Sequence, residues 1–118
     1  MTEPSPPDPY CRIAEVLSVF KGRWKGEIIA LLREDTLRFS TLRRRISSAS
    51  ARSLTESLRA LERDGVVSRQ QFVAVPPHVE YSLTEHGRAL LPLLDLIRAW
   101  GEKHLACVEA CRREFDRR

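Results

Sequence analysis

Residues 50–67 have the sequence SARSLTESLRALERDGVV, which contains a helix together with both of its end signals. Ser50 belongs to the residue types that cap helix N-termini, and Gly65 stands where a left-handed C-terminal cap requires glycine. Apolar residues at helical spacing form the inner face: Ala51, Leu54, Leu58 and Leu61. The segment therefore predicts an amphipathic helix over residues 51–64 whose outer face is polar and charged.

A shorter helix is expected just before this one. Ser40 is the expected N-cap, and Leu42 and Ile46 are the apolar residues that face inward. The small polar residues 47–50 then form a turn. Two helices joined by so short a turn predict a helix-turn-helix.

A β-hairpin is expected after the second helix. Residues 66–72 are rich in β-branched and polar side chains, which favours a strand, and residues 79–83 favour the returning strand. Two adjacent prolines between them cannot continue the ladder, so residues 73–77 form a loop. The hairpin over residues 66–83 is the wing of a winged helix.

The two ends of the chain are expected to be helical. Apolar periodicity predicts helices over about 10–20 and 24–32 and, with Thr84 as N-cap, over about 85–115. Pro92 should kink this last segment or split it into two helices. The apolar stripe beyond Pro92 would be exposed in a monomer, which predicts a dimer. We therefore expect a mainly α fold with a β-hairpin wing, a winged helix-turn-helix with helices at both its N- and C-terminal ends and a dimer contact at the C-terminal one.

Length and composition narrow the class of protein. The 118 residues favour one domain, expected over residues 10–118 after a disordered lead-in at residues 1–9. With 42% hydrophobic and 31% charged residues, the composition excludes a disordered or a membrane protein. The N-terminus lacks the order of a signal peptide, so we expect the cytoplasm. Three cysteines, an odd number, agree with a reducing compartment.

Positive charge is concentrated in residues 38–69. This segment holds eight arginines, no lysine and three acidic residues, a net charge of +5, whereas the whole chain has +4. Because arginine forms bidentate contacts with phosphates and guanine edges, the segment favours nucleic-acid binding. The alternative is an ordinary solvated helix surface.

The candidate DNA contacts follow from how a helix-turn-helix docks, with its first helix at the backbone and its second helix in the major groove. The first helix offers Ser40, Arg43 and Arg44. The second helix, which is the recognition helix, offers Ser50, Arg52, Ser53, Thr55, Glu56 and Arg59, and the wing offers His78. Arg52 is the leading candidate. Glu56 either accepts a hydrogen bond from cytosine or pairs with Arg52 or Arg59 one turn away. His78 is either a phosphate contact or an exposed loop histidine.

Motifs in order along the chain resemble the HxlR-type winged helix regulators. The most specific is VPPHVEYSLT at residues 75–84. The others are residues 16–17, 22–24, 38–43, 50–55, 58–59, 61–62 and 64–67, with Cys11 and Gly87. The sequence departs from the family pattern at His78, where the family usually has arginine or lysine, and at residues 47–49, which lack the frequent Pro-Gly pair.

The resemblance implies a transcription regulator that binds double-stranded DNA as a homodimer. The first and last helices would form the dimer, and two recognition helices would enter successive major grooves of a palindromic operator. Repression is the commoner outcome for a small regulator without an activation domain. The alternative is a winged helix that binds protein or RNA without specific DNA recognition. We expect no enzyme, cofactor or metal site, because the three histidines are scattered and no glycine-rich phosphate loop is present.

The cysteines include one candidate sensor. Cys11 is expected at the start of the first helix beside Arg12, and both a helix N-terminus and a neighbouring cation favour the thiolate. A cysteine at this position resembles the sensor of quinones, aldehydes or oxidants in HxlR-type proteins, which would make a small reactive inducer a partner. The alternative is a small side chain packed in the dimer contact. Cys107 and Cys111 could face a partner subunit, act as resolving thiols for Cys11, or be ordinary semi-buried cysteines.

Overall fold

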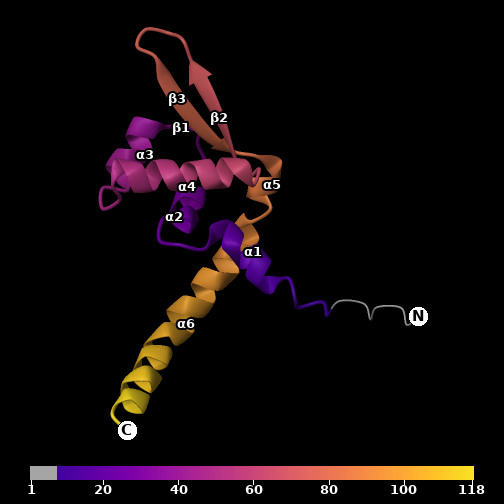
Figure 1. Cartoon of the computed structure of the whole chain (residues 1–118), viewed down its shortest axis with the longest axis vertical. Helices are drawn as coiled ribbons and strands as arrows, with labels where there is room; N and C mark the ends of the chain where they lie inside the picture. The colour runs from indigo at the N-terminus through magenta and orange to yellow at the C-terminus, as the bar shows by residue number, and fades with distance from the viewer. Residues whose placement is uncertain (1–7) are drawn as a thin grey trace, which may run out of the picture.

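The computed structural model describes residues 8–118 as a winged helix with a long C-terminal helix. In Figure 1, α4 crosses the middle, the β2–β3 hairpin stands on one side of it, and α6 runs away from the other side. The lead-in expected at residues 1–9 lies outside the described residues except for its last two. In chain order the elements are α1 (Ile13–Phe20), α2 (Lys25–Leu31), β1 (Leu37–Arg38), α3 (Phe39–Arg45), α4 (Ala51–Arg63), β2 (Val67–Phe72), β3 (His78–Leu83), α5 (Glu85–Arg88) and α6 (Leu91–Asp116).

The ends of α4 are the ones that the sequence predicts. The Ser50 hydroxyl accepts a hydrogen bond from the backbone N–H of Ser53 at 3.0 Å, which caps the N-terminus. At the other end, Gly65 has a φ of +75°, and the N–H of Val66 reaches back to the carbonyl of Leu61 at 2.9 Å. This is the Schellman arrangement, in which glycine accepts the left-handed conformation that other residues avoid.

The start of α3 differs from the expectation. Ser40 is not the N-cap, because the helix already begins at Phe39, and Arg38 occupies the cap position without a side-chain cap bond. The cause is β1, whose two residues pair with β3 so that Leu37 opposes Tyr81. The chain therefore passes directly from a strand into a helix, and Phe39 packs against the core.

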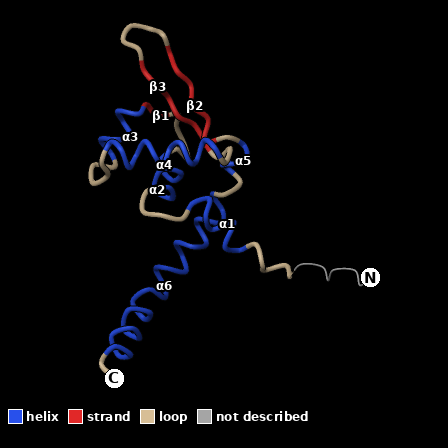
Figure 2. Tube along the Cα trace, viewed as in Figure 1, coloured by secondary structure: helices blue, strands red, loops and turns tan. Residues whose placement is uncertain are grey.

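The wing is part of a small antiparallel sheet with the strand order β1-β3-β2. Figure 2 shows the short β1 beside the base of the long hairpin. The pairing of β1 with β3 is absent from the sequence-based expectations. The returning strand begins at His78, one residue earlier than expected.

The core lies between α4, α2, α3 and the base of the sheet. Leu54, Leu58 and Leu61 of α4 are fully buried, as the helical spacing predicts. Burying each leucine contributes about 1.5–3 kcal/mol to folding. The buried residues of the described part of the chain include no polar or charged side chain. The core thus fixes α4 in place while its opposite face stays in solvent.

A short helix links the wing to the last helix. The Thr84 side chain caps α5 by accepting from the N–H of Gly87 at 2.9 Å, as the sequence predicts. The same hydroxyl donates to the carbonyl of Gly65 at 2.6 Å, so α5 is tied to the segment that joins α4 to β2. Pro92 lies in the first turn of α6, and it therefore separates α5 from α6 rather than kinking one long helix.

The two terminal helices differ from the rest of the chain in their burial. Neither α1 nor α6 has a buried residue, although both carry large apolar side chains. Those with the greatest exposure include Ile13 at 50%, Leu96 at 69% and Trp100 at 55%. Within residues 8–118 of one copy, the exposed parts of their apolar faces are thus left without a partner.

Candidate nucleic-acid interface

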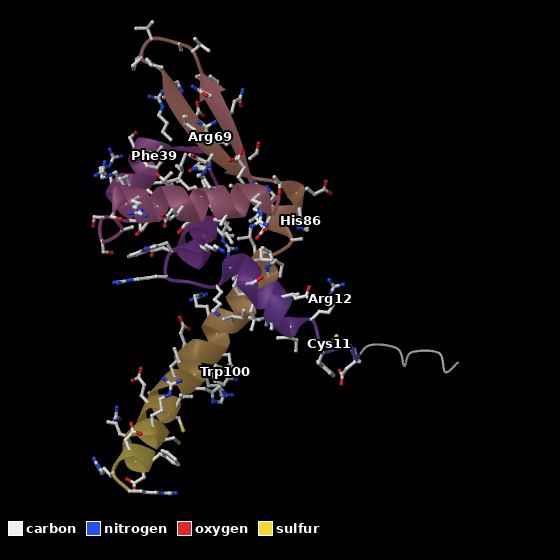
Figure 3. The ribbon with its side chains drawn as sticks, viewed as in Figure 1. Cys11, Arg12, Phe39, Arg69, His86 and Trp100 are labelled. Atoms are coloured by element: carbon white, nitrogen blue, oxygen red, sulfur yellow. The ribbon has the colours of Figure 1, made fainter. Side chains whose placement is uncertain are left out.

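A groove runs between α4, the start of α3 and the wing. It has a volume of about 810 Å³ and is open to solvent. Three arginines line it, each from a different element: Arg38 from β1, Arg59 from α4 and Arg69 from β2. Figure 3 shows Arg69 on the hairpin, on the side where the hairpin rises from α4. A concave surface lined by several guanidinium groups suits a polyanion such as a nucleic-acid backbone.

Strand register explains why Arg69 lies at the groove. Arg69 opposes Tyr81 in the β2–β3 ladder, so the two side chains share one face of the sheet. Only 7% of the Tyr81 surface is exposed, because that face of the sheet covers the core. Arg69 and Arg38 are absent from the sequence-predicted contacts. Alternation along the strand indicates which residues share a face with Arg69, but its place at the groove depends on the register against Tyr81, which the sequence does not show.

The first turns of α4 present polar side chains that already have partners within the chain. Arg52 Nε lies 3.0 Å from Glu56 Oε1, and these side chains are 88% and 65% exposed. Of the alternatives open for Glu56, pairing with Arg52 is therefore the one observed. The Thr55 hydroxyl donates to the carbonyl of Ala51 at 2.7 Å. The Thr55 oxygen can therefore still accept a hydrogen bond from a partner, and the two terminal nitrogens of Arg52 can still donate hydrogen bonds to one.

The remaining contacts predicted on the two helices lie at three places. Ser53 and Ser50 are joined through their hydroxyl groups at 3.0 Å, at the exposed N-terminus of α4. Ser40 lines the groove from α3. Arg43 and Arg44 are exposed in the last turn of α3 and do not line the groove. The structure thus gathers Ser40, Thr55 and Arg59 with His78 of the wing in one groove, but it leaves the α3 arginines on a neighbouring surface.

His78 is neither exposed nor in the loop, so the alternative of an exposed loop histidine is wrong. It begins β3 and lines the groove, and its contact with a phosphate stays a prediction. Its side chain is only 18% exposed, and its Nε2 lies 2.9 Å from Glu80 Oε2. Its ring stacks on Phe72 of the opposite strand with the centroids 4.8 Å apart. Strand pairing of Phe72 with His78 causes this burial. His78 therefore closes the top of the hairpin.

The tip of the wing is apolar. Val73 and Val75 are 93% and 98% exposed, and residues 73–77 contain no charged side chain. The positive charge of the wing therefore lies on its stem, at Arg69, rather than at its tip.

Cys11 precedes the first helix instead of lying in it. It is exposed in a turn, two residues before α1 begins at Ile13. Arg12 donates a hydrogen bond to Glu15 at 3.0 Å, which raises the pKa of Arg12 and engages its guanidinium. The neighbouring cation expected to favour the Cys11 thiolate is thus occupied by Glu15. Cys107 and Cys111 are both exposed on α6, so they are not semi-buried within one copy of the chain.

These features define a class of protein. Winged helix transcription regulators have this architecture: a helix-turn-helix that ends in the capped helix α4, a three-stranded wing, and a groove lined by arginines. No helix within residues 8–118 combines the length and the apolar character needed to cross a membrane.

The chain belongs to the HxlR-like helix-turn-helix family, whose pattern matches residues 19–109. Among curated relatives, an uncharacterized HTH-type transcriptional regulator, YdeP of Bacillus subtilis, is 40% identical over 110 residues, covering 91% of this chain and 86% of YdeP. YtfH of Escherichia coli, with the same description, is 44% identical over 104 residues, covering 88% and 82%. The resemblance found in the sequence is thus confirmed, and the chain is a transcription regulator with a helix-turn-helix.

A solved structure of similar fold is a redox regulator, HypR, in its reduced form. It superposes with a TM-score of 0.76 at 41% identity, covering 83% of this chain and 97% of HypR.

Proposed function

We propose that this protein binds a palindromic operator as a homodimer and represses transcription. The observation that carries the proposal is the groove beside the exposed face of α4, which three arginines, Arg38, Arg59 and Arg69, line together with one acidic residue, Glu62. In this arrangement α4 enters the major groove, and the arginines hold the phosphates that flank it. Membership of the HxlR-like helix-turn-helix family supports DNA as the partner of this chain.

The N-terminal part of α4 is the segment that contacts bases. Ser50, Ser53 and Arg52 lie at its first turn, where a helix N-terminus also attracts a phosphate. Glu56 orients Arg52 through their ion pair, so the Arg52 guanidinium approaches the base edges in a fixed direction. Arg43 and Arg44 at the end of α3 contact the backbone from the side. The apolar tip of the wing packs on sugars rather than pairing with phosphates.

The unpartnered faces of α1 and α6 support the homodimer. Exposed apolar side chains follow both helices, and a patch of this kind on a free monomer would promote aggregation. A second copy of the chain covers them and brings the two α4 helices into successive major grooves. Because the target is chromosomal DNA, the protein acts in the cytoplasm. Repression follows if operator binding excludes other proteins from the promoter.

Removing groove arginines should weaken DNA binding in a salt-dependent way. For Arg59→Ala and for Arg69→Ala, we expect the slope of log affinity against log salt to fall by about 1.8, because each phosphate contact contributes about 0.9 and a dimer has each arginine twice. Affinity at moderate salt should fall about tenfold or more. Fluorescence anisotropy with a duplex selected from a random pool measures both.

Arg63→Ala is the matched control, because Arg63 is on α4 but does not line the groove. An unchanged salt slope in both groove variants contradicts the proposal. Wild-type binding that competitor DNA abolishes would favour the alternative, a winged helix without specific DNA recognition.

We further propose that Cys11 makes operator binding sensitive to oxidants or electrophiles. Cys11 is exposed, and thiols of this kind are open to such reagents. Structures of similar fold support the idea, since they include HypR in reduced and oxidized forms and YodB of Bacillus subtilis after treatment with diamide. Modification at the turn before α1 would act through the dimer contact and so on the two α4 helices.

Diamide should lower the operator affinity of the wild type and leave Cys11→Ser unaffected. Allosteric coupling free energies correspond to about 5- to 150-fold changes in affinity, and we expect an effect in this range. Anisotropy before and after treatment, followed by reduction, is the measurement. A double variant, Cys107→Ser with Cys111→Ser, tests whether a resolving thiol is needed. An equal response of Cys11→Ser and the wild type contradicts the role of Cys11.

A further inference from the structure

Arg33 joins the last helix to the DNA-binding part of the chain. Its guanidinium Nη2 lies 2.5 Å from Asp95 Oδ1 of α6, although 62 residues separate them in sequence. Arg33 follows the end of α2 and belongs to the helix-turn-helix side of the molecule. The backbone carbonyl of Arg33 also accepts a hydrogen bond from Arg88 Nη1 of α5 at 3.0 Å. We call these three residues the Arg33 junction.

The Arg33 junction is the one polar side-chain attachment of α6 to other elements within residues 8–118. The other ion pairs of α6 are internal, such as Arg98 with Glu102 at 2.9 Å. Leu91 and Leu94 pack against the core, but apolar contacts are non-directional and tolerate rotation. The ion pair between Arg33 and Asp95 instead ties one point of α6 to one point of the helix-turn-helix part of the molecule. The two side chains are 40% and 46% exposed.

The length of α6 amplifies any change at this junction. The helix has 26 residues, which at about 1.5 Å per residue gives a rod of about 39 Å. A tilt of about 10° at its attached end moves the far end by about 7 Å, from that length. Successive base pairs are about 3.4 Å apart along DNA, so such a tilt amounts to roughly two base pairs. Figure 1 shows α6 leaving the body from this attached end.

We infer that the Arg33 junction sets the angle between α6 and α4, and thereby determines which half-site spacing the dimer accepts. The inference rests on the proposed function, since it needs two α4 helices joined through the terminal helices. It assigns Arg33, Asp95 and Arg88 a positioning role, because none of them lines the groove and each acts through the placement of α4.

The experiment is a spacing series with the full chain. Two half-sites from a duplex selected with the wild type are separated by the selected spacer or by one shortened or lengthened by one or two base pairs. The wild type should prefer one spacing about tenfold or more, as a rigid dimer does. Asp95→Ala should reduce that preference to about threefold or less. Binding to a single half-site should remain unchanged.

Three further variants separate positioning from folding. Asp95→Asn keeps the size of the side chain and loses its charge, and it should relax the spacing preference if Asp95→Ala folds poorly. Glu102→Ala is the matched control, because it breaks an ion pair within α6 and should keep the wild-type preference. Exchanging the charges, Arg33→Asp with Asp95→Arg, should restore most of the preference.

The outcomes distinguish the inference from the proposed function. If Asp95→Ala and Asp95→Asn both keep the wild-type spacing preference, the Arg33 junction does not determine the spacing. The proposal of DNA binding is then unaffected. Relaxation by Glu102→Ala to the same extent also overturns it, since any weakening of α6 would then suffice. Absence of specific binding by the wild type at every spacing overturns the proposed function, and the inference falls with it.

Discussion

Replacing Gly87 with alanine is expected to lower the free energy of unfolding by about 3 kcal/mol, the upper end of what overpacking costs. Gly87 is buried in α5, where a Cβ atom would lie 2.1 Å from the carbonyl oxygen of Val66. The obstacle is backbone that cannot move aside freely, because the same oxygen accepts a hydrogen bond from the Thr84 N–H at 3.1 Å. The substitution should push α5 away from the start of β2.

Urea unfolding followed by circular dichroism measures this change, at one fixed protein concentration because dimerisation contributes to stability. Gly26→Ala in α2 is the matched control. A Cβ there meets nothing within 4 Å, so the helix should gain up to about 1 kcal/mol from the better helix propensity of alanine. Equal effects at the two glycines would mean that α5 does not approach β2 so closely.

Local signals explain which parts of the fold are predictable from the sequence. The cap at Ser50 and the left-handed Gly65 act within a few residues of the helix they end, so the bounds of α4 follow from the sequence. The start of α3 depends instead on the pairing of Leu37 with Tyr81, a residue 44 positions further along the sequence. Nothing near Ser40 reveals that pairing, and the expected cap was therefore wrong.

The candidate site shows the same division. Helical spacing places Arg59 on the outer face of α4 and puts Glu56 within reach of Arg52, which is one of the pairings that the sequence left open. Arg69 requires the register of two strands, and the burial of His78 requires its stacking on Phe72 across the hairpin. Contacts made by one helix are thus predictable here, and contacts that depend on strand pairing are not.

The spacing of the exposed side chains on α6 gives the dimer proposal a specific geometry. A seam with alternating steps of four and three residues follows the helix: Leu93, Ile97, Trp100, His104, Cys107 and Cys111. Such spacing keeps one stripe facing a partner helix. Figure 3 shows Trp100 projecting from the side of α6. Its ring packs against His104 of the same helix, with the centroids 4.9 Å apart.

Trp100→Asp should therefore convert the protein to a monomer at micromolar concentration. The charge would face its own copy across the seam, where like charges and a lost aromatic contact both oppose association. Joining two half-site contacts in one dimer raises affinity by about 10²–10⁴-fold, so the monomer should bind the full palindrome at least about 100-fold more weakly. Sedimentation velocity measures the assembly, and anisotropy measures the affinity.

The control introduces the same charge on the other side of the same helix. Ala106 is exposed and lies well away from the Trp100 seam at about 100° per residue. Ala106→Asp should remain dimeric and bind the palindrome as the wild type does. Because Trp100 is 55% exposed in one copy, its loss should leave the unfolding of the core itself largely unchanged. If Trp100→Asp stays dimeric, the seam on α6 is not the dimer contact. If it is monomeric yet binds the palindrome with full affinity, the two half-sites do not depend on each other, and the palindromic mode of binding is wrong.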